Sequence, residues 1–209
     1  PNGIKNYVAP DDGTNVHLTI DHVLQYIAER ELDKAMQEHN AQAATIIMMD
    51  PETGGILALA NRPTYNPNNF ADYSAELWRN RAISDTYEPG STFKIITAAA
   101  ALEEGVVHPN DKFYCPGHID VAGQTINCWK KEGHGKQTFS EVVENSCNPG
   151  FVQVGERIGK EKFDKYIRAF GFGKKTGVDL PGEAKGLLYA LDKIGPVELA
   201  TISFGHGVS

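Results

Sequence analysis

The sequence predicts a globular domain that mixes α-helices with antiparallel strands. Its 209 residues, 41% hydrophobic and 22% charged, are ordinary for one globular domain with a sizeable core. Short apolar runs separated by turn residues indicate hairpins, and several longer stretches have the apolar spacing of helices. The chain has no internal repeat.

The first elements are a strand, a helix and a hairpin. Residues 16–20 are typical of a strand, and Asp21 can cap a helix whose apolar positions share one face. Those positions are Leu24, Ile27, Ala28, Leu32, Ala35 and Met36. Two apolar runs, 44–50 and 55–60, are joined by Pro51–Gly54, which predicts a hairpin.

The rest of the chain continues the mixed pattern. An Asn/Pro-rich loop leads to a helix that starts near Ser91 and contains the apolar run Ile95–Ala101. A second hairpin is expected over 113–127, with its turn at Ala122–Gly123. Helical patterns follow near 139–145, 150–158, 161–170 and 195–203.

The start of the Ser91 helix breaks a local rule of helix chemistry. A serine that opens a helix is stabilised by Glu or Gln three residues later, but here that residue is Lys94. A cation in the first turn faces the positive end of the helix dipole, which costs up to about 1 kcal/mol. Residues three apart share a helix face, so the amine can reach the hydroxyl.

This S-x-x-K pattern predicts a nucleophilic serine with a lysine base. Burial and the helix dipole would lower the pKa of Lys94, so that its neutral amine is accessible near pH 7. The N-terminal amides of the helix would stabilise an oxyanion formed at Ser91. The alternative is an ordinary N-cap serine followed by a solvated surface lysine.

A second polar motif is Ser146–Asn148, an S-x-N triplet in a helix-breaking setting between two helical patterns. A hydroxyl and a carboxamide two residues apart on a tight loop can relay a proton and hold a substrate amide. The alternative is an Asx-type turn ahead of Pro149.

In order and spacing, the two motifs resemble those of the penicilloyl-serine transferases, the penicillin-binding proteins and serine β-lactamases. Other segments resemble the start of a class B penicillin-binding protein transpeptidase domain, in family order over nearly the whole chain. They are Leu18–Asp21, Leu24–Gln25, Met49–Gly54, Ile56–Ala58, Arg62–Pro67, Tyr87–Lys94, Thr176–Glu183 and Ser203–Gly205.

The resemblance implies an α+β fold in which an antiparallel sheet is flanked by helices and the serine lies at the edge of the sheet. It implies that residues 16–209 are the N-terminal part of the transpeptidase domain, incomplete at its C-terminus. Residues 1–15 are then a linker from a preceding region.

The activity implied by the resemblance is that of a peptidoglycan D,D-transpeptidase, a target of β-lactam antibiotics. Ser91 would attack a stem peptide ending in D-Ala-D-Ala and Lys94 would take its proton. Ser146 would pass the proton to the leaving amine, and Asn148 would orient Lys94 and the substrate amide. No cofactor is implied for catalysis. Alternatives are a β-lactamase or D,D-carboxypeptidase of the same fold and, from another class, an inactive scaffold or a β-lactam sensor.

The net charge of -7 argues against nucleic acid as a partner. No apolar run is long enough to span a membrane, and no signal peptide opens the chain. Family members are tethered outside the cytoplasmic membrane by an N-terminal helix, so we expect an extracytoplasmic protein whose tether lies outside this chain. The Ser-Cys-Asn triplet is similar to class B proteins of Gram-positive spore formers, which favours a division or sporulation glycosyltransferase as partner.

A third family motif, K-T-G, occurs at Lys175–Gly177, but we interpret this copy as non-catalytic. It lies in the glycine-rich connection Gly171–Gly177, with no apolar strand before it. We therefore expect the catalytic triplet beyond Ser209, and we expect this chain by itself to be inactive.

The cysteines and histidines predict a structural zinc site. Cys115 and Cys128 combine with His118 and His134 in the pattern C-x2-H-x9-C-x5-H, and thiolates and imidazoles are the ligands that zinc prefers. We expect Cys115, Cys128 and His134 as ligands, with His118 or Asp120 as the fourth. Strand alternation places His118 and Asp120 on the face opposite the cysteines, which leaves the fourth ligand open.

Two other states of these cysteines remain open. Cys115 and Cys128 could form a disulfide in an exported protein, or both could be buried free thiols. Cys147, inside the S-x-N triplet, is expected to be a small packed side chain.

Overall fold

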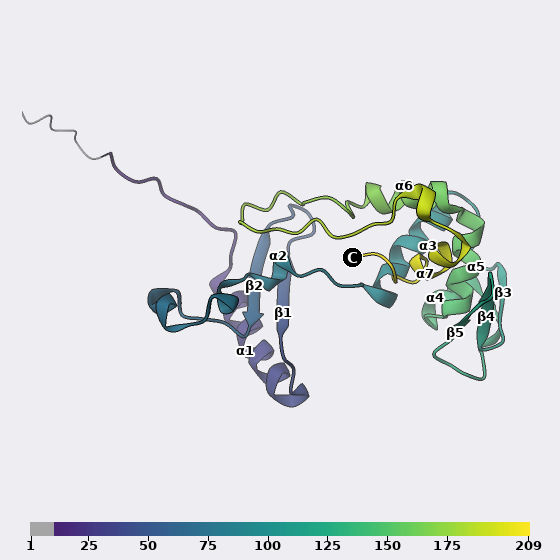
Figure 1. Ribbon diagram of the computed structural model, residues 1–209, viewed down its shortest axis with the longest axis horizontal. Coiled ribbons are helices and arrows are strands. Elements are labelled where there is room, and N and C mark those ends of the chain that lie inside the picture. Colours follow the sequence, from purple (N-terminus) through teal and green to yellow (C-terminus); the bar gives the residue numbers. More distant parts are fainter. Residues whose placement is uncertain (1–10) are drawn as a thin grey trace, which may run out of the picture. The chain divides into compact units, whose positions relative to one another are not determined.

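Figure 1 shows the computed structural model, in which residues 11–209 are described. The chain divides into two compact units, one that ends at Ala82 and one that runs from Ile83 to Ser209. The first part of the expected linker, residues 1–10, lies outside the described residues. Residues 11–15 contain neither helix nor strand.

The first unit is built from a helix and a two-stranded antiparallel sheet, α1 (His22–His39), β1 (Ala44–Met49) and β2 (Ile56–Arg62). The predicted helix cap is confirmed, because the Asp21 carboxylate accepts hydrogen bonds from the backbone N–H groups of Val23 and Leu24. The predicted hairpin is also confirmed. The apolar face of α1 packs on the sheet through a small core that consists of Ala28, Leu32, Ala58 and Ala60.

The predicted strand at residues 16–20 is wrong. The segment forms no strand, and Val16 and Leu18 are 81% and 75% exposed. It is tied to β2 at isolated points, where the Thr19 hydroxyl donates to Ile56 O and Asp21 N donates to Leu57 O. Two separated contacts do not make the continuous ladder that defines a strand.

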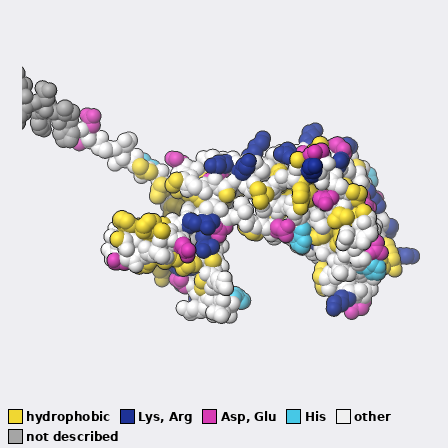
Figure 2. All heavy atoms as spheres, in the orientation of Figure 1, with side chains coloured by type: hydrophobic (Ala, Val, Ile, Leu, Met, Phe, Trp, Pro, Cys, Tyr) yellow, Lys and Arg dark blue, Asp and Glu magenta, His cyan; other side chains and the backbone are white. Residues whose placement is uncertain are grey.

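The Asn/Pro-rich loop after β2 forms two short 3-10 helices, η1 (Pro67–Asp72) and η2 (Ala75–Trp78). Two aromatic pairs, one of Phe70 with Trp78, pack edge to face in this loop. The indole N–H of Trp78 donates to Phe70 O at 3.1 Å. Figure 2 shows hydrophobic side chains gathered on the surface of this loop. The short helix α2 (Arg81–Ser84) follows.

The second unit contains most of the helices. Its elements are η3 (Gly90–Phe93), α3 (Lys94–Glu103), β3 (Lys112–Cys115), β4 (His118–Val121), β5 (Gln124–Asn127), β6 (Gly135–Thr138), α4 (Phe139–Glu144), α5 (Asn148–Ile158), α6 (Lys160–Ala169), η4 (Leu191–Lys193) and α7 (Pro196–Ile202). The four predicted helices in residues 139–203 are confirmed as α4 to α7. Helix α5 lies at the centre, where Phe151, Val152 and Val154 are fully buried, and it packs against α3, α6 and α7 (Figure 1).

The second predicted hairpin is correct at its turn but not in its full extent. Strands β4 and β5 pair through a turn at Ala122 and Gly123, both of which have positive φ. Strand β3 instead pairs with the more distant β6. The chain turns away after β3 at Gly117, whose φ is +104°, and Gly117 O accepts a hydrogen bond from Cys128 N. The mixed class is confirmed, since antiparallel strand pairs combine with packed helices.

Candidate active site and thiol cluster

Ser91 lies on the surface in the 3-10 turn that precedes α3. The turn begins at Gly90, whose φ is +57° and whose N–H donates to Gly205 O. The two backbones approach so closely that a Cβ at Gly205 would lie 2.1 Å from Gly90 O. Phe93 is buried and anchors the other end of the turn. The serine hydroxyl is therefore presented to solvent by a firmly held backbone.

The alternative of an N-cap serine with a surface lysine is wrong on both points. The turn begins after Pro89, without a side-chain cap, and Ser91 lies inside it. Lys94 is only 4% exposed. Its Nζ donates to three oxygens of the S-x-N triplet, Ser146 O at 2.8 Å, Ser146 Oγ at 3.0 Å and Asn148 Oδ1 at 2.7 Å.

Burial lowers the pKa of Lys94 from 10.5 to about 8, while the thiols of Cys147 and Cys128 oppose that shift. The three acceptors suit a neutral amine as well as an ammonium. A neutral amine has two N–H donors, which match Ser146 O and Asn148 Oδ1, and its lone pair can then accept a proton from a hydroxyl. Lys94 is thus placed to act as a base at mildly alkaline pH.

The S-x-N triplet forms a tight turn between α4 and α5. Asn145 ends α4, Ser146 has a φ of +48°, and Asn148 begins α5. A positive φ is uncommon for a residue with a Cβ and costs free energy. The turn places both Ser146 oxygens and the Asn148 side chain toward Lys94.

The structure therefore brings three of the four predicted catalytic residues into direct contact: Lys94, Ser146 and Asn148. Ser91 lies one turn before Lys94. Among the hydrogen bonds of the described residues, none joins the Ser91 hydroxyl to Lys94 Nζ.

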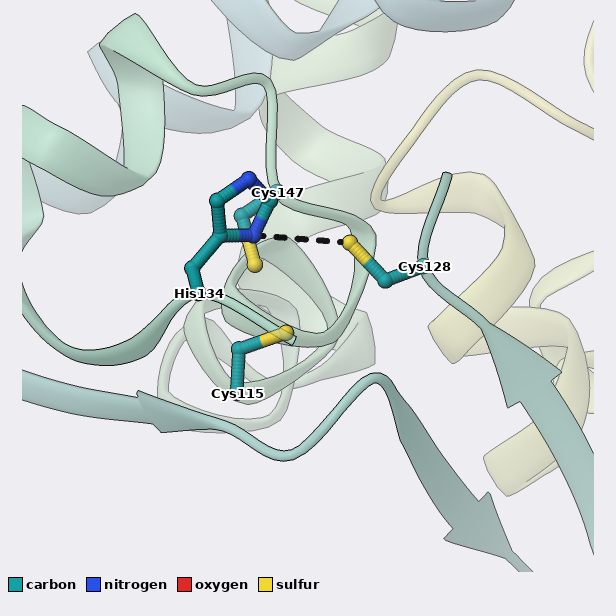
Figure 3. Close-up of side chains that lie close together, drawn as sticks. All are labelled: Cys115, Cys128, His134 and Cys147. Atoms are coloured by element: carbon teal, nitrogen blue, oxygen red, sulfur yellow. Dashed lines mark hydrogen bonds between the residues drawn. The ribbon is translucent and has the colours of Figure 1, made fainter. Parts of the chain in front are cut away.

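Directly behind the S-x-N turn, four side chains converge on one point (Figure 3): Cys115, Cys128, His134 and Cys147. Their ligand atoms all lie within 4.8 Å of one another, and Cys128 Sγ is 3.5 Å from His134 Nδ1. The three cysteines are buried and have free thiols. We call these four residues the thiol cluster, and it could hold a metal ion.

The prediction of His118 or Asp120 as the fourth residue of the cluster is wrong, because Cys147 lies there. His118 and Asp120 lie on the exposed face of β4, where they line a surface hollow, and the Asp120 carboxylate accepts a hydrogen bond from the Thr125 hydroxyl. Cys147 takes the position expected for one of them. Its predicted packing is confirmed, since it is fully buried in the core, and its thiol also faces the other three ligand atoms. A usable signal was present, because a third cysteine completes the Cys₃His set that structural zinc sites use.

The electrostatics of the thiol cluster are uneven. Burial raises the pKa of Cys147 to about 12. Burial also acts to raise the pKa of Cys115, but hydrogen bonds from the backbone of His134 and Gly117 and with the thiols of Cys147 and Cys128 together lower that pKa. Burial and nearby Lys130 lower the pKa of His134, which favours the neutral imidazole that a metal requires. His134 Nε2 is buried with no hydrogen-bond partner among the described residues.

The K-T-G copy at Lys175–Gly177 lies outside any strand of the described residues. The hydroxyl and N–H of Thr176 both donate to the Glu183 carboxylate, and the Gly177 N–H donates to the same group. These contacts form a local turn and not the strand on which the family carries its catalytic triplet.

Residues 44–209 match the family model described as the penicillin binding protein transpeptidase domain. The chain belongs to the class B penicillin-binding protein transpeptidases. The predicted family and its α+β transpeptidase fold are therefore confirmed.

Curated relatives of the family agree with this assignment. The chain is 50% identical over 211 residues to Stage V sporulation protein D of Bacillus subtilis. The alignment covers 100% of this chain and 33% of that protein. It is 34% identical over 209 residues to the probable peptidoglycan D,D-transpeptidase PbpC of Pseudomonas aeruginosa, covering 100% of this chain and 37% of that protein. The chain spans about a third of the length of these relatives.

Two solved structures show the same fold. Penicillin-binding protein 3 of Mycobacterium tuberculosis, complexed with aztreonam, superposes with a TM-score of 0.84 at 31% identity, over 91% of this chain and 43% of that chain. The transpeptidase domain of Burkholderia pseudomallei penicillin-binding protein 3 superposes with a TM-score of 0.81 at 30% identity, over 95% of this chain and 55% of that chain.

Among the described residues, no helix combines the length and apolar character that a membrane crossing requires.

Proposed function

We propose that the protein is a peptidoglycan D,D-transpeptidase that works through a serine acyl-enzyme and is acylated by β-lactams. The observation that carries this proposal is the environment of Lys94, a buried lysine with a pKa lowered to about 8 whose Nζ contacts both polar residues of the S-x-N turn. A buried amine of this kind suits proton transfer to and from a nearby hydroxyl.

In the proposed acylation, Ser91 Oγ attacks the carbonyl carbon of the penultimate D-Ala and its proton passes to neutral Lys94. The tetrahedral intermediate then expels the terminal D-Ala. Its amine takes a proton from the Ser146 hydroxyl, and Lys94 returns a proton to Ser146 through their 3.0 Å contact. An amine of a neighbouring stem peptide then attacks the acyl-enzyme and gives its proton to neutral Lys94. The ester bond to Ser91 breaks as the amide cross-link forms, and Lys94 returns the proton to Ser91 Oγ.

Asn148 has a positioning role in this scheme. Its Oδ1 accepts a hydrogen bond from Lys94, which orients the amine between the two serines. Its Nδ2 donates to Asn127 O at 3.3 Å, a long bond that a substrate carbonyl could replace.

The setting we propose follows the family. Residues 16–209 would form the N-terminal part of the transpeptidase domain. The protein would act on the extracytoplasmic face of the bacterial membrane, beside a division or sporulation glycosyltransferase. The name of the Bacillus subtilis relative supports the sporulation role.

We also propose that the thiol cluster binds a structural zinc ion. Three thiols and one imidazole fit zinc, and all four side chains are buried or half-buried. The four ligand atoms lie within 4.8 Å of one another, so these side chains would hold the ion after a modest movement toward it. With four protein ligands the ion would have no open position, so it would join β3, the loop after β5 and the S-x-N turn without taking part in the chemistry.

The enzymatic proposal is tested by acylation of the full-length protein with a fluorescent penicillin, followed by intact-mass analysis. We expect one adduct per chain, its loss in Ser91→Ala, and its retention in Thr92→Ala, which removes the other exposed hydroxyl of the same turn. Slow release of the label supports a transpeptidase, whereas release within seconds would identify a β-lactamase. An intact parent protein without any adduct would identify a scaffold.

The zinc proposal is tested by metal analysis of full-length protein purified without added zinc. We expect one zinc per chain and three thiols that react with an alkylating reagent only after chelation and unfolding. A metal-free protein with Cys115 and Cys128 unreactive until reduction would favour the disulfide.

A further inference from the structure

Three consecutive residues, the last of β5 and the two that follow it, each contact one residue of the S-x-N turn or its flank. Asn127 O accepts from Asn148 Nδ2, and Cys128 meets Cys147 within the thiol cluster. The indole N–H of Trp129 donates to Asn145 O at 2.9 Å. Residues 127–129 therefore follow the turn along its length and hold it on both sides of Ser146.

The Asn145 carbonyl is a group that needs a partner. It lies at the C-terminal end of α4, where the backbone carbonyl groups receive no hydrogen bond from an N–H group of the helix. The next residue, Ser146, holds a φ of +48°, and such a conformation persists only where its surroundings fix it. A donor on the carbonyl just before Ser146 fixes the peptide plane from which that conformation starts.

Trp129 is suited to this task because its ring is fixed although most of it is exposed. The side chain is 66% exposed, so it contributes little to the core. Its ring packs edge to face on His134, with the ring centroids 5.3 Å apart. The indole is thus anchored to the thiol cluster at one side and bonded to the S-x-N turn at the other.

We propose that Trp129 is a positioning residue for acylation: its hydrogen bond to Asn145 O holds the S-x-N turn so that both Ser146 oxygens face Lys94. This inference rests on the proposed function, because it assigns Trp129 to the same catalytic site. Trp129 itself contacts neither Lys94 nor Ser91 in the described hydrogen bonds.

The test compares Trp129→Phe with Trp78→Phe in the full-length protein. Phenylalanine keeps an aromatic ring but removes the N–H. Trp78 is a matched control, since it is 44% exposed, packs edge to face on Phe70 and also donates its indole N–H to a backbone carbonyl. With a penicillin, Trp129→Phe should lower the first-order acylation rate constant about three- to tenfold, the value of one hydrogen bond. The dissociation constant of the non-covalent complex should stay at the parental value.

A second readout is independent of acylation. Amide hydrogen exchange over residues 145–148 should become faster in Trp129→Phe and stay parental in Trp78→Phe. Melting temperature and metal content serve as folding controls for both variants.

The outcomes separate the two proposals. A parent protein without an adduct refutes the proposed function and with it any role of Trp129 in acylation, whereas amide exchange still shows whether Trp129 holds the S-x-N turn. Parental acylation and parental amide exchange in Trp129→Phe would overturn the positioning role. A changed dissociation constant with an unchanged rate constant would make Trp129 a substrate contact instead.

Discussion

The pocket of Lys94 and the thiol cluster are two buried polar sites that share the S-x-N turn, and they differ in how well protein atoms satisfy them. Lys94 Nζ has three oxygen partners at 2.7–3.0 Å. In the thiol cluster the contacts involve sulfur and are longer, such as the 3.5 Å contact of Cys128 Sγ with His134 Nδ1, and His134 Nε2 has no hydrogen-bond partner among the described residues.

This difference in hydrogen bonding indicates a different role for each site. Buried polar groups are normally hydrogen-bonded, and exceptions require an explanation. Lys94 Nζ already has three oxygen partners within the chain, so the orientation of its amine does not depend on a bound ligand. The thiol cluster instead brings four potential metal-ligand atoms within 4.8 Å of one another, which agrees with the proposed zinc.

The largest effect should come from removing the base itself. Lys94→Ala should reduce acylation of the full-length protein by a penicillin at least about 100-fold, the loss typical of a general base. Stopped-flow measurement of the acylation rate checks this. Lys165→Ala, which removes an exposed lysine of α6, should react like the parent. Acylation of Lys94→Ala at the parental rate would remove the assigned role.

Removing a ligand from the thiol cluster should come next. His134→Ala should weaken zinc binding by more than the ~10–100-fold that an outer-shell partner is worth, because it deletes a ligand. Competition with a chelator measures the affinity. His118→Ala is the matched control and should bind zinc like the parent, since His118 lies on the exposed face of β4. Equal losses in the two variants would contradict the four-residue cluster.

The pH dependence of acylation should be smaller and gradual. Since burial lowers the pKa of Lys94 to about 8, the neutral base becomes scarcer below that pH. The acylation rate should therefore fall up to tenfold for each pH unit below about 8 and level off above it. A pH–rate profile with a neutral β-lactam checks this. The residual acylation of Lys94→Ala should not show the fall in rate below about pH 8. A rate that is flat from pH 6 to 9 would assign the base elsewhere.

Local signals made much of the fold predictable. Asp21 before an apolar face gave α1, and Pro51–Gly54 between two apolar runs gave the first hairpin, because caps and turns depend on neighbouring residues. The pairing of β3 with β6 was not predictable in this way, since no turn joins the two strands. The segment 16–20 has strand composition but lacks a partner for a full ladder.

The residues of the candidate site likewise differ in how well local sequence predicts them. Lys94 could be singled out from its position in the first turn of a helix, and S-x-N from its order after S-x-x-K. Cys147 could not be joined to the other thiols by alternation, because it comes from the turn between two helices and meets β3 only in the folded chain. Trp129 carries no motif, and its role depends on a hydrogen bond to a backbone atom.

The positive φ of Ser146 sets stability against activity at one position. Glycine adopts this conformation without strain, so Ser146→Gly should relieve about 1 kcal/mol that a side chain costs there. The same change removes the hydroxyl that faces Lys94. Ser146→Gly should therefore raise the melting temperature, and if Ser146 relays protons as proposed, the same variant should be acylated more slowly by a penicillin.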